Sequence, residues 1–134
     1  MTSQIIYNSD LRTTATHLQS GTTIETDAPT DNQGKGERFS PTDLIATALA
    51  TCMITTMGIK AKTMNILLDG TTADVTKIMA SDPRRISKIV VHIHFPKTLQ
   101  IEDKEKVILE NTARNCPVER TLHPDCEREF SFNW

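Results

Sequence analysis

The chain has 134 residues, a net charge of −2 and only 4% aromatic residues. This length suffices for a hydrophobic core, so residues 1–134 are predicted to form a single domain. The weak net charge gives no basic surface for nucleic acid or a membrane, and no window approaches the ~20 apolar residues of a membrane span. The N-terminus lacks a basic start followed by an apolar run, so we expect a cytoplasmic protein.

The first quarter of the chain is predicted to form an antiparallel meander. Residues 3–18 and 22–26 are rich in β-branched threonine and lack a helical period, and Ser20-Gly21 is typical of a turn between strands. Residues 27–37 contain glycine, proline and asparagine, which indicates a loop.

A central helix is predicted over residues 41–60. Ser40 can cap its free N–H groups, Pro41 suits the first helical position, and Asp43 stands where a capping box places its acidic residue. No charged residue occurs from Leu44 to Ile59. A helix that is apolar on every side is expected to be buried on every side.

The rest of the chain alternates between strands and helices. The predicted elements are, in order, strands at 66–68, 71–79 and 86–95, helices at 101–116 and 117–122, and a strand at 130–134. In the 86–95 strand, every second residue from Ile89 to Phe95 is apolar, which predicts one buried face. The order of elements predicts an α+β fold with antiparallel sheets packed around the long buried central helix.

Cys52 lies in the middle of the predicted central helix. It is either a small hydrophobic core residue or a reactive thiol, and burial would make it inert unless a cation stands beside it. Arg12, on a strand packed over the helix, is one candidate for that cation. Arg38 precedes the helix start, about 16–18 Å along the axis from Cys52, so it could reach the thiol only across a dimer.

Cys116 precedes Pro117 and is therefore predicted to be the N-cap of a short helix. The positive end of that helix, together with Arg114 and Arg120, predicts that Cys116 is the more acidic thiol. The alternative is a weak capping residue without chemistry. Cys126 is interpreted as a loop thiol without a partner.

A zinc site is the main alternative to thiol chemistry. Its candidate ligands are Cys116, His123, Cys126 and Cys52. There is no Cys-x-x-Cys pair, and the candidates belong to different predicted elements, so we expect no metal. His92 and His94 are interpreted as part of a solvated sheet face. No phosphate-binding loop or nucleophile elbow is present, so we expect no cofactor.

Four motifs resemble those of the OsmC/Ohr family, the osmotically induced and organic hydroperoxide resistance proteins. They occur in the family's order and span almost the whole chain. They are Ser40-Pro41-Thr42-Asp43-Leu44, Ala48-Leu49-Ala50-Thr51-Cys52, Pro83-Arg84-Arg85-Ile86 and Cys116-Pro117-Val118. The third motif is most similar to the OsmC-like branch.

The resemblance implies an intertwined homodimer with a thiol peroxidase site at each interface. By this resemblance, Cys52 is the peroxidatic cysteine, and its thiolate attacks an organic hydroperoxide and becomes a sulfenic acid. Cys116 is the resolving cysteine, which forms a disulfide with Cys52. A dithiol such as lipoamide then reduces the disulfide.

The residues that would activate the thiolate depart from the family pattern. Family members carry an arginine and a glutamate that holds it, and the glutamate stands at or beside the positions of Thr42 and Asp43 here. Asp43 could replace it with a shorter side chain. Arg12 best matches the arginine, and Arg38 is the alternative. This departure keeps a second hypothesis open, in which the same fold binds a small apolar or electrophilic molecule with little peroxidase turnover.

Overall fold

A computed structural model describes all residues from Met1 to Trp134. The elements are β1 (Ser3–Asn8), β2 (Arg12–His17), β3 (Thr23–Asp27), the 3-10 helix η1 (Thr30–Asn32), α1 (Pro41–Thr63), β4 (Thr72–Ser81), β5 (Arg84–His94), α2 (Asp103–Ala113), α3 (Pro117–Thr121) and β6 (Glu127–Asn133). The chain divides into two compact units, Met1–Ile45 and Ala46–Trp134, and each is described by itself.

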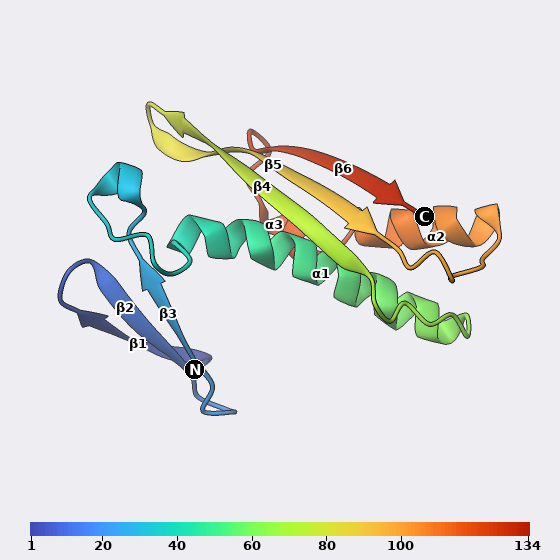
Figure 1. The fold of residues 1–134 in the computed structure, drawn as a ribbon, viewed down its shortest axis with the longest axis horizontal. Coiled ribbons are helices and arrows are strands. Elements are labelled where there is room, and N and C mark those ends of the chain that lie inside the picture. The colour runs from blue at the N-terminus through green and yellow to red at the C-terminus, as the bar shows by residue number, and fades with distance from the viewer. The chain divides into compact units, whose positions relative to one another are not determined.

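The first unit is a three-stranded antiparallel sheet with the strand order β1-β2-β3, which confirms the predicted meander (Figure 1). Its register places Arg12, the first residue of β2, opposite Asp27, the last residue of β3. The loop after β3 folds back on itself at Gly34, where an added Cβ would lie 1.6 Å from the carbonyl oxygen of Ala28. Only glycine permits this close approach, which returns the chain toward Asp27.

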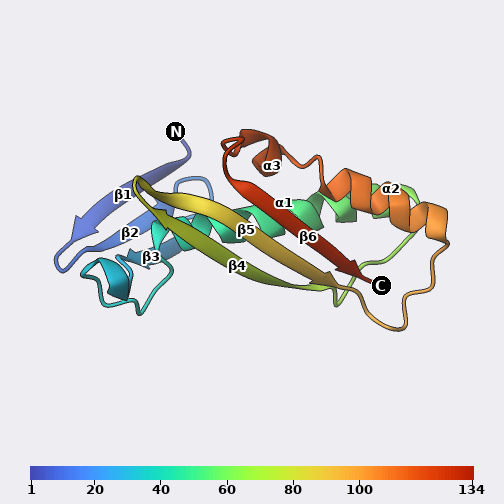
Figure 2. The same ribbon diagram turned by 90° about the horizontal axis from the view of Figure 1, so that it is seen from above.

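The second unit contains a sheet with the strand order β4-β5-β6 (Figure 2). Strands β4 and β5 are antiparallel, as predicted, but β5 and β6 are parallel. The prediction of purely antiparallel sheets is therefore wrong for this pair. Helices α2 and α3 carry the chain back to the start of β5, so β6 runs in the same direction as β5, and such a crossover yields a parallel pair.

The core of the second unit lies between α1, α2 and one face of the sheet (Figures 1 and 2). The predicted alternation in β5 is confirmed, because Ile89, Val91 and Ile93 are fully buried and Phe95 nearly so. Leu109 of α2 is also fully buried. Each such large apolar side chain contributes about 1.5–3 kcal/mol on burial.

Helix α1 begins as predicted but is buried on one face only. Its buried residues repeat every three or four positions and are Ala46, Leu49, Ala50, Met53, Met57 and Ala61. Thr51, Thr55 and Ile59 are exposed on the other side, and Ile59 keeps 67% of its surface accessible. The prediction of burial on every side is therefore wrong for the single chain, since the sheet and α2 cover only one face.

Helix α1 also corrects the prediction that no window approaches the ~20 apolar residues of a membrane span. It has 23 residues and is apolar enough to span a membrane by length and composition alone. The same test is passed by core helices of soluble proteins, and the buried face of α1 belongs to the hydrophobic core.

The predicted strand at 66–68 is absent, because this segment pairs with no strand. Asn65 adopts the left-handed conformation with φ 57°, and the N–H of Ile66 donates to the carbonyl of Ala61 at 2.9 Å. This is a Schellman motif, which ends α1 and turns the chain away from it.

Candidate functional site

The structure brings Cys52 and Cys116 together, although α2, β4 and β5 separate them along the chain. The two thiols are close enough to interact electrostatically. Both are free thiols, Cys52 half-buried on α1 and Cys116 fully buried at the start of α3. Two adjacent reduced thiols can be oxidised to a disulfide without a large rearrangement of the chain.

Cys116 is the N-cap of α3, as predicted. Its sulfur accepts the backbone N–H of Glu119 at 3.5 Å, and Pro117 occupies the first helical position. Burial nevertheless raises the pKa of the Cys116 thiol, and the neighbouring Cys52 thiol raises it further. The N–H groups of Glu119 and Val118 oppose this shift without overcoming it.

The prediction that Cys116 is the more acidic thiol is therefore not supported. The partial charge at the start of α3 favours the thiolate, but the complete loss of water around the sulfur outweighs it. The guanidinium of Arg114, which was expected to help, lies over the rings of Phe130 and Phe132, at 5.7 Å and 5.0 Å from their centroids.

Thr56 is a neighbour of Cys52 that sequence reasoning missed. Its hydroxyl donates to the Cys52 carbonyl at 2.6 Å and lies 4.0 Å from the Cys52 sulfur. The i, i+4 spacing of the two residues on one helix would have indicated this contact. A hydroxyl at this position can turn toward the sulfur when the sulfur carries charge.

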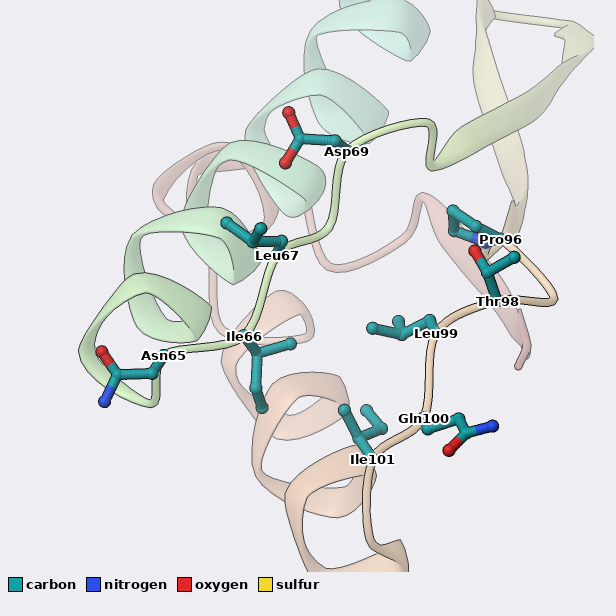
Figure 3. A pocket seen from close by; sticks show the side chains of 9 residues that line it. All are labelled: Asn65, Ile66, Leu67, Asp69, Pro96, Thr98, Leu99, Gln100 and Ile101. Carbon is teal, nitrogen blue, oxygen red and sulfur yellow. The ribbon is translucent and has the colours of Figure 1, made fainter.

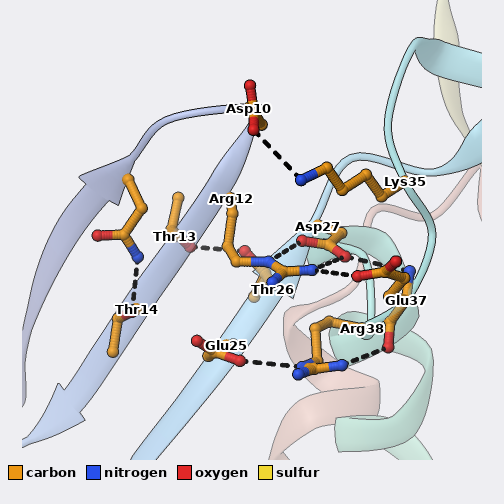
Figure 4. A network of polar contacts seen from close by, with 11 residues as sticks. Asp10, Arg12, Thr13, Thr14, Glu25, Thr26, Asp27, Lys35, Glu37 and Arg38 are labelled. Carbon is orange, nitrogen blue, oxygen red and sulfur yellow. Dashed lines mark hydrogen bonds and ion pairs between the residues drawn. The ribbon is translucent and has the colours of Figure 1, made fainter.

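The first unit holds a cluster of charged side chains around Arg12 (Figure 4). The guanidinium donates from Nε and from one amino group to the two carboxylate oxygens of Asp27, at 2.7 Å and 2.9 Å. The same amino group donates to Glu37 at 2.8 Å. Two of the three guanidinium nitrogens of Arg12 therefore bind carboxylates: Asp27 accepts from both, and Glu37 accepts from one of them.

Asp27 is the buried member of this cluster, with 1% of its surface exposed. The hydrogen bonds from Arg12 lower the pKa of Asp27 to about 2, and the backbone N–H of Glu37 contributes in the same direction. The two carboxylates in turn raise the pKa of Arg12. Arg12 is therefore held rigidly as a cation.

Asp43 is the predicted carboxylate for the arginine, whereas the structure pairs Arg12 with Asp27 and Glu37. Asp43 accepts the backbone N–H of Ser40 at 2.8 Å and donates its own N–H to the Ser40 hydroxyl at 3.1 Å, which completes a capping box. The cross-strand pairing of Arg12 and Asp27 would have been the signal for Asp27.

Arg38, the alternative cation, is more exposed than Arg12. It donates to Glu25 of β3 at 2.9 Å and to the carbonyl of Glu37 at 3.0 Å (Figure 4). The second contact fixes the backbone next to the Glu37 side chain that binds Arg12. Arg38 therefore contributes to the shape of the cluster.

The residues of the zinc alternative do not form a metal site. No three His, Cys, Asp or Glu side chains lie together in an arrangement that could hold a metal ion. Cys126 is buried and its thiol faces the carbonyl of Glu127 at 3.8 Å. The ring of His123 accepts the backbone N–H of Asp125 within the same turn.

A surface pocket of about 460 Å³ lies where the loop after α1 meets the loop after β5 (Figure 3). It is lined by Asn65, Ile66, Leu67, Asp69, Pro96, Thr98, Leu99, Gln100 and Ile101. Cys52 is on α1 about 16 Å before the end of that helix, so the pocket is separate from the thiol pair.

Comparison with known proteins identifies the fold and the family. The sequence model described as OsmC-like protein matches residues 34–130. A protein from Psychrobacter arcticus 273-4, with a provisional description as an osmotic stress induced and detoxification response protein, is 53% identical. That match covers 99% of this chain and 96% of the other, with a TM-score of 0.94.

More distant structures share the fold. An organic hydroperoxide resistance protein OsmC from Legionella pneumophila is 15% identical over 100% of this chain and 98% of its own, with a TM-score of 0.77. The organic hydroperoxide resistance protein OhrB of Bacillus subtilis is 15% identical over 99% and 98%, with a TM-score of 0.66. No curated protein matches the chain. With α+β architecture, the paired cysteines and a family match over most of its length, the chain belongs to the OsmC-like protein family.

Proposed function

We propose that the protein is a cysteine-based thiol peroxidase that reduces organic hydroperoxides. The observation that carries this proposal is the contact between the free thiols of Cys52 and Cys116. A thiol that becomes a sulfenic acid beside a second thiol condenses with it to a disulfide, which protects it from further oxidation.

In the first step, the Cys52 thiolate attacks the terminal oxygen of the hydroperoxide. The O–O bond breaks, Cys52 becomes a sulfenic acid, and the alkoxide takes up a proton and leaves as an alcohol. Cys52 suits this role because it is the half-buried member of the pair and is therefore open to substrate. Cys116 is fully buried and suits the resolving role.

In the second step, Cys116 attacks the sulfur of the sulfenic acid, and a Cys52–Cys116 disulfide and water are formed. An external dithiol, of the lipoyl type or another, reduces the disulfide by two thiol–disulfide exchanges. The raised pKa of Cys116 slows its attack while it remains a thiol.

Arg12 is proposed as the cation that stabilises the Cys52 thiolate, with Arg38 as the alternative across a dimer. The two carboxylates on Arg12 fix the direction of its guanidinium. We propose Asp27 and Glu37 as the carboxylates that orient it, a role that sequence analysis gave to Asp43.

The functional unit is proposed to be an intertwined homodimer in the cytoplasm. The face of α1 with Thr51, Thr55 and Ile59 is exposed in the single chain, yet it carries no charge. An uncharged face of a long helix favours a protein partner over water. A second copy would bury this face and enclose Cys52 in an apolar site that favours organic over inorganic peroxide.

The test is to mix the reduced protein with cumene hydroperoxide and dihydrolipoamide and to follow peroxide loss. Mass spectrometry after one equivalent of peroxide identifies the products on each cysteine. The expected result is turnover with a Cys52–Cys116 disulfide as the only disulfide. Turnover no faster than that of a Cys52→Ser variant would exclude the peroxidase.

A second candidate function is the binding of a small apolar or electrophilic molecule by the same fold. The raised pKa of Cys116 favours it, because a thiol that stays protonated resolves a sulfenic acid slowly. This function predicts a stable adduct on Cys52 with an electrophile such as N-ethylmaleimide and no catalytic peroxide loss. Light scattering tests the dimer in either case, since a stable monomer would contradict it.

A further inference from the structure

The short helix α3, which begins at Cys116, is held from outside by Arg128 of β6. The Arg128 guanidinium donates from Nε and from one amino group to the same Glu119 carboxylate oxygen, at 3.2 Å and 2.9 Å. Its other amino group donates to the carbonyl of His123 at 3.1 Å and to the carbonyl of Cys126. One side chain therefore ties α3, the following turn and the sheet together.

Such a tie is needed because α3 has only five residues. A helix of this length does not form by itself, since nucleation costs more than so few hydrogen bonds return. Arg128 and Glu119 are both about four-fifths buried, with 21% and 20% of their side chains exposed. Arg128 also sits in the strand pairing opposite Ile89, a fully buried residue of β5, so its backbone has a fixed position.

Glu119 is also the residue whose N–H is capped by the Cys116 sulfur. Its backbone N–H donates to that sulfur at 3.5 Å, while its carboxylate is held by Arg128. The same residue thus carries both the ion pair to Arg128 and the hydrogen bond to the Cys116 sulfur. A movement of Glu119 would carry the N–H away from the sulfur and free the first turn of α3.

We propose that Arg128 is a positioning residue for disulfide formation: through Glu119 it keeps the first turn of α3 in place and so holds the Cys116 sulfur against Cys52. The step is the condensation of a sulfenic acid with a thiol. The S–S bond forms, the S–O bond of Cys52 breaks, and the hydroxyl group leaves with the Cys116 proton as water. The inference rests on the proposed function for the identity of the oxidant, an organic hydroperoxide.

The test compares the two steps in a single turnover. The reduced Arg128→Lys variant receives one equivalent of cumene hydroperoxide, and samples are quenched over time with dimedone, which labels sulfenic acid. Lysine keeps the charge but lacks the planar guanidinium whose separate nitrogens reach Glu119 and the two carbonyls. We expect sulfenic acid on Cys52 to form at the wild-type rate and the disulfide to form about tenfold more slowly, because small displacements of reacting atoms are costly.

A matched control is Lys88→Gln. Lys88 has 24% of its side chain exposed and binds Glu127 and Glu129, the residues on either side of Arg128, which belong to β6 and not to α3. It should leave both steps unchanged. Glu119→Gln keeps the acceptor oxygen but not the charge, so it should slow disulfide formation by a smaller factor, and it serves as the second variant if Arg128→Lys does not fold.

A second arm separates this inference from the proposed function. Diamide converts two adjacent thiols directly to a disulfide and is itself reduced to a hydrazine, so it needs no peroxidase activity. If wild-type protein does not react with peroxide, the proposed function fails. Slower diamide-driven disulfide formation in Arg128→Lys would still support the positioning role of Arg128. An unchanged rate of disulfide formation with both oxidants, or equal slowing of sulfenic acid and disulfide formation, overturns the positioning role.

Discussion

The two sets of candidate functional residues use opposite kinds of environment. Cys52 and Cys116 lie against the hydrophobic core of the second unit, and Cys116 has no contact with solvent. Arg12 lies in the first unit among carboxylates, and its guanidinium is held by two of them. We call the surroundings of the fully buried Cys116 the dry region and the surroundings of Arg12 the charged region.

This difference shows what each region can contribute to thiol chemistry. Burial lowers the reactivity of a thiol, as the raised pKa of Cys116 illustrates. A cation held in a fixed position can offset this loss of thiol reactivity. The Arg12 cluster contains a guanidinium whose direction is fixed before any substrate binds. If Arg12 stabilises the Cys52 thiolate as proposed, the activity depends on both regions.

The largest expected effect comes from removing the thiol that faces substrate. Cys52→Ser should abolish peroxide consumption, because serine cannot form a sulfenic acid. Cys116→Ser should instead allow one equivalent of sulfenic acid to form on Cys52 and then stop. Peroxide loss and dimedone labelling measure the two outcomes.

Cys126→Ser is the control for these variants, since Cys126 is also buried and its thiol faces only a backbone carbonyl. It should retain full turnover. Loss of turnover in Cys116→Ser with retention in Cys52→Ser would reverse the assigned roles.

The next largest effect tests the charged region. Arg12→Met should lower the rate of sulfenic acid formation by about a hundredfold, the usual cost of removing a charge-stabilising donor. Asp27→Asn leaves Arg12 charged but less firmly oriented, so its effect should be smaller. Stopped-flow measurement of the first step provides the readout.

Arg38→Met distinguishes between the two candidate cations. Its guanidinium binds an exposed carboxylate and a carbonyl, so a change to methionine should leave the first step nearly unchanged if Arg12 is the activator. A greater loss in Arg38→Met than in Arg12→Met would assign the role to Arg38.

Features encoded by neighbouring residues could be predicted from the sequence. The Ser40 cap and Pro41 set the start of α1, and alternation in β5 set its buried face. The cysteine pair came from the resemblance of its two motifs to a family, because no local pattern joins Cys52 to Cys116. The parallel β6 was missed, since its direction depends on the path of the whole crossover.

The charged cluster was only partly predictable for the same reason. Arg12 was named, but its partners Asp27 and Glu37 come together through strand register and a loop that folds back at Gly34. The acidity of Cys116 was misjudged because its helix end is local, whereas its burial is produced by distant parts of the chain.

A smaller effect should appear in the pH dependence of stability. The pKa of Asp27 is about 2 in the folded protein and about 4 in an unfolded chain. A lowered carboxyl pKa stabilises the fold above the unfolded value, and this contribution disappears as pH falls from about 4 to about 2. Urea unfolding of wild type and Asp27→Asn should therefore differ by a constant amount from pH 5 to 7 and converge below pH 4. Curves that stay parallel down to pH 2 would contradict the Arg12–Asp27 pairing.

The smallest effect concerns the dry region. The Cys52 thiol is a secondary cause of the raised pKa of Cys116, and burial is the main one. Cys52→Ala should therefore lower the pKa of Cys116 but leave it above that of an ordinary thiol. The measurement is the rate of Cys116 alkylation by iodoacetamide from pH 7 to 10, in a Cys126→Ser background. At each pH, the Cys52→Ala protein should react less than about tenfold faster than the protein that keeps Cys52. Alkylation of Cys116 as fast as that of free cysteine would show that Cys52, and not burial, suppresses its reactivity. The contrast between the dry and the charged region would then fail at this thiol.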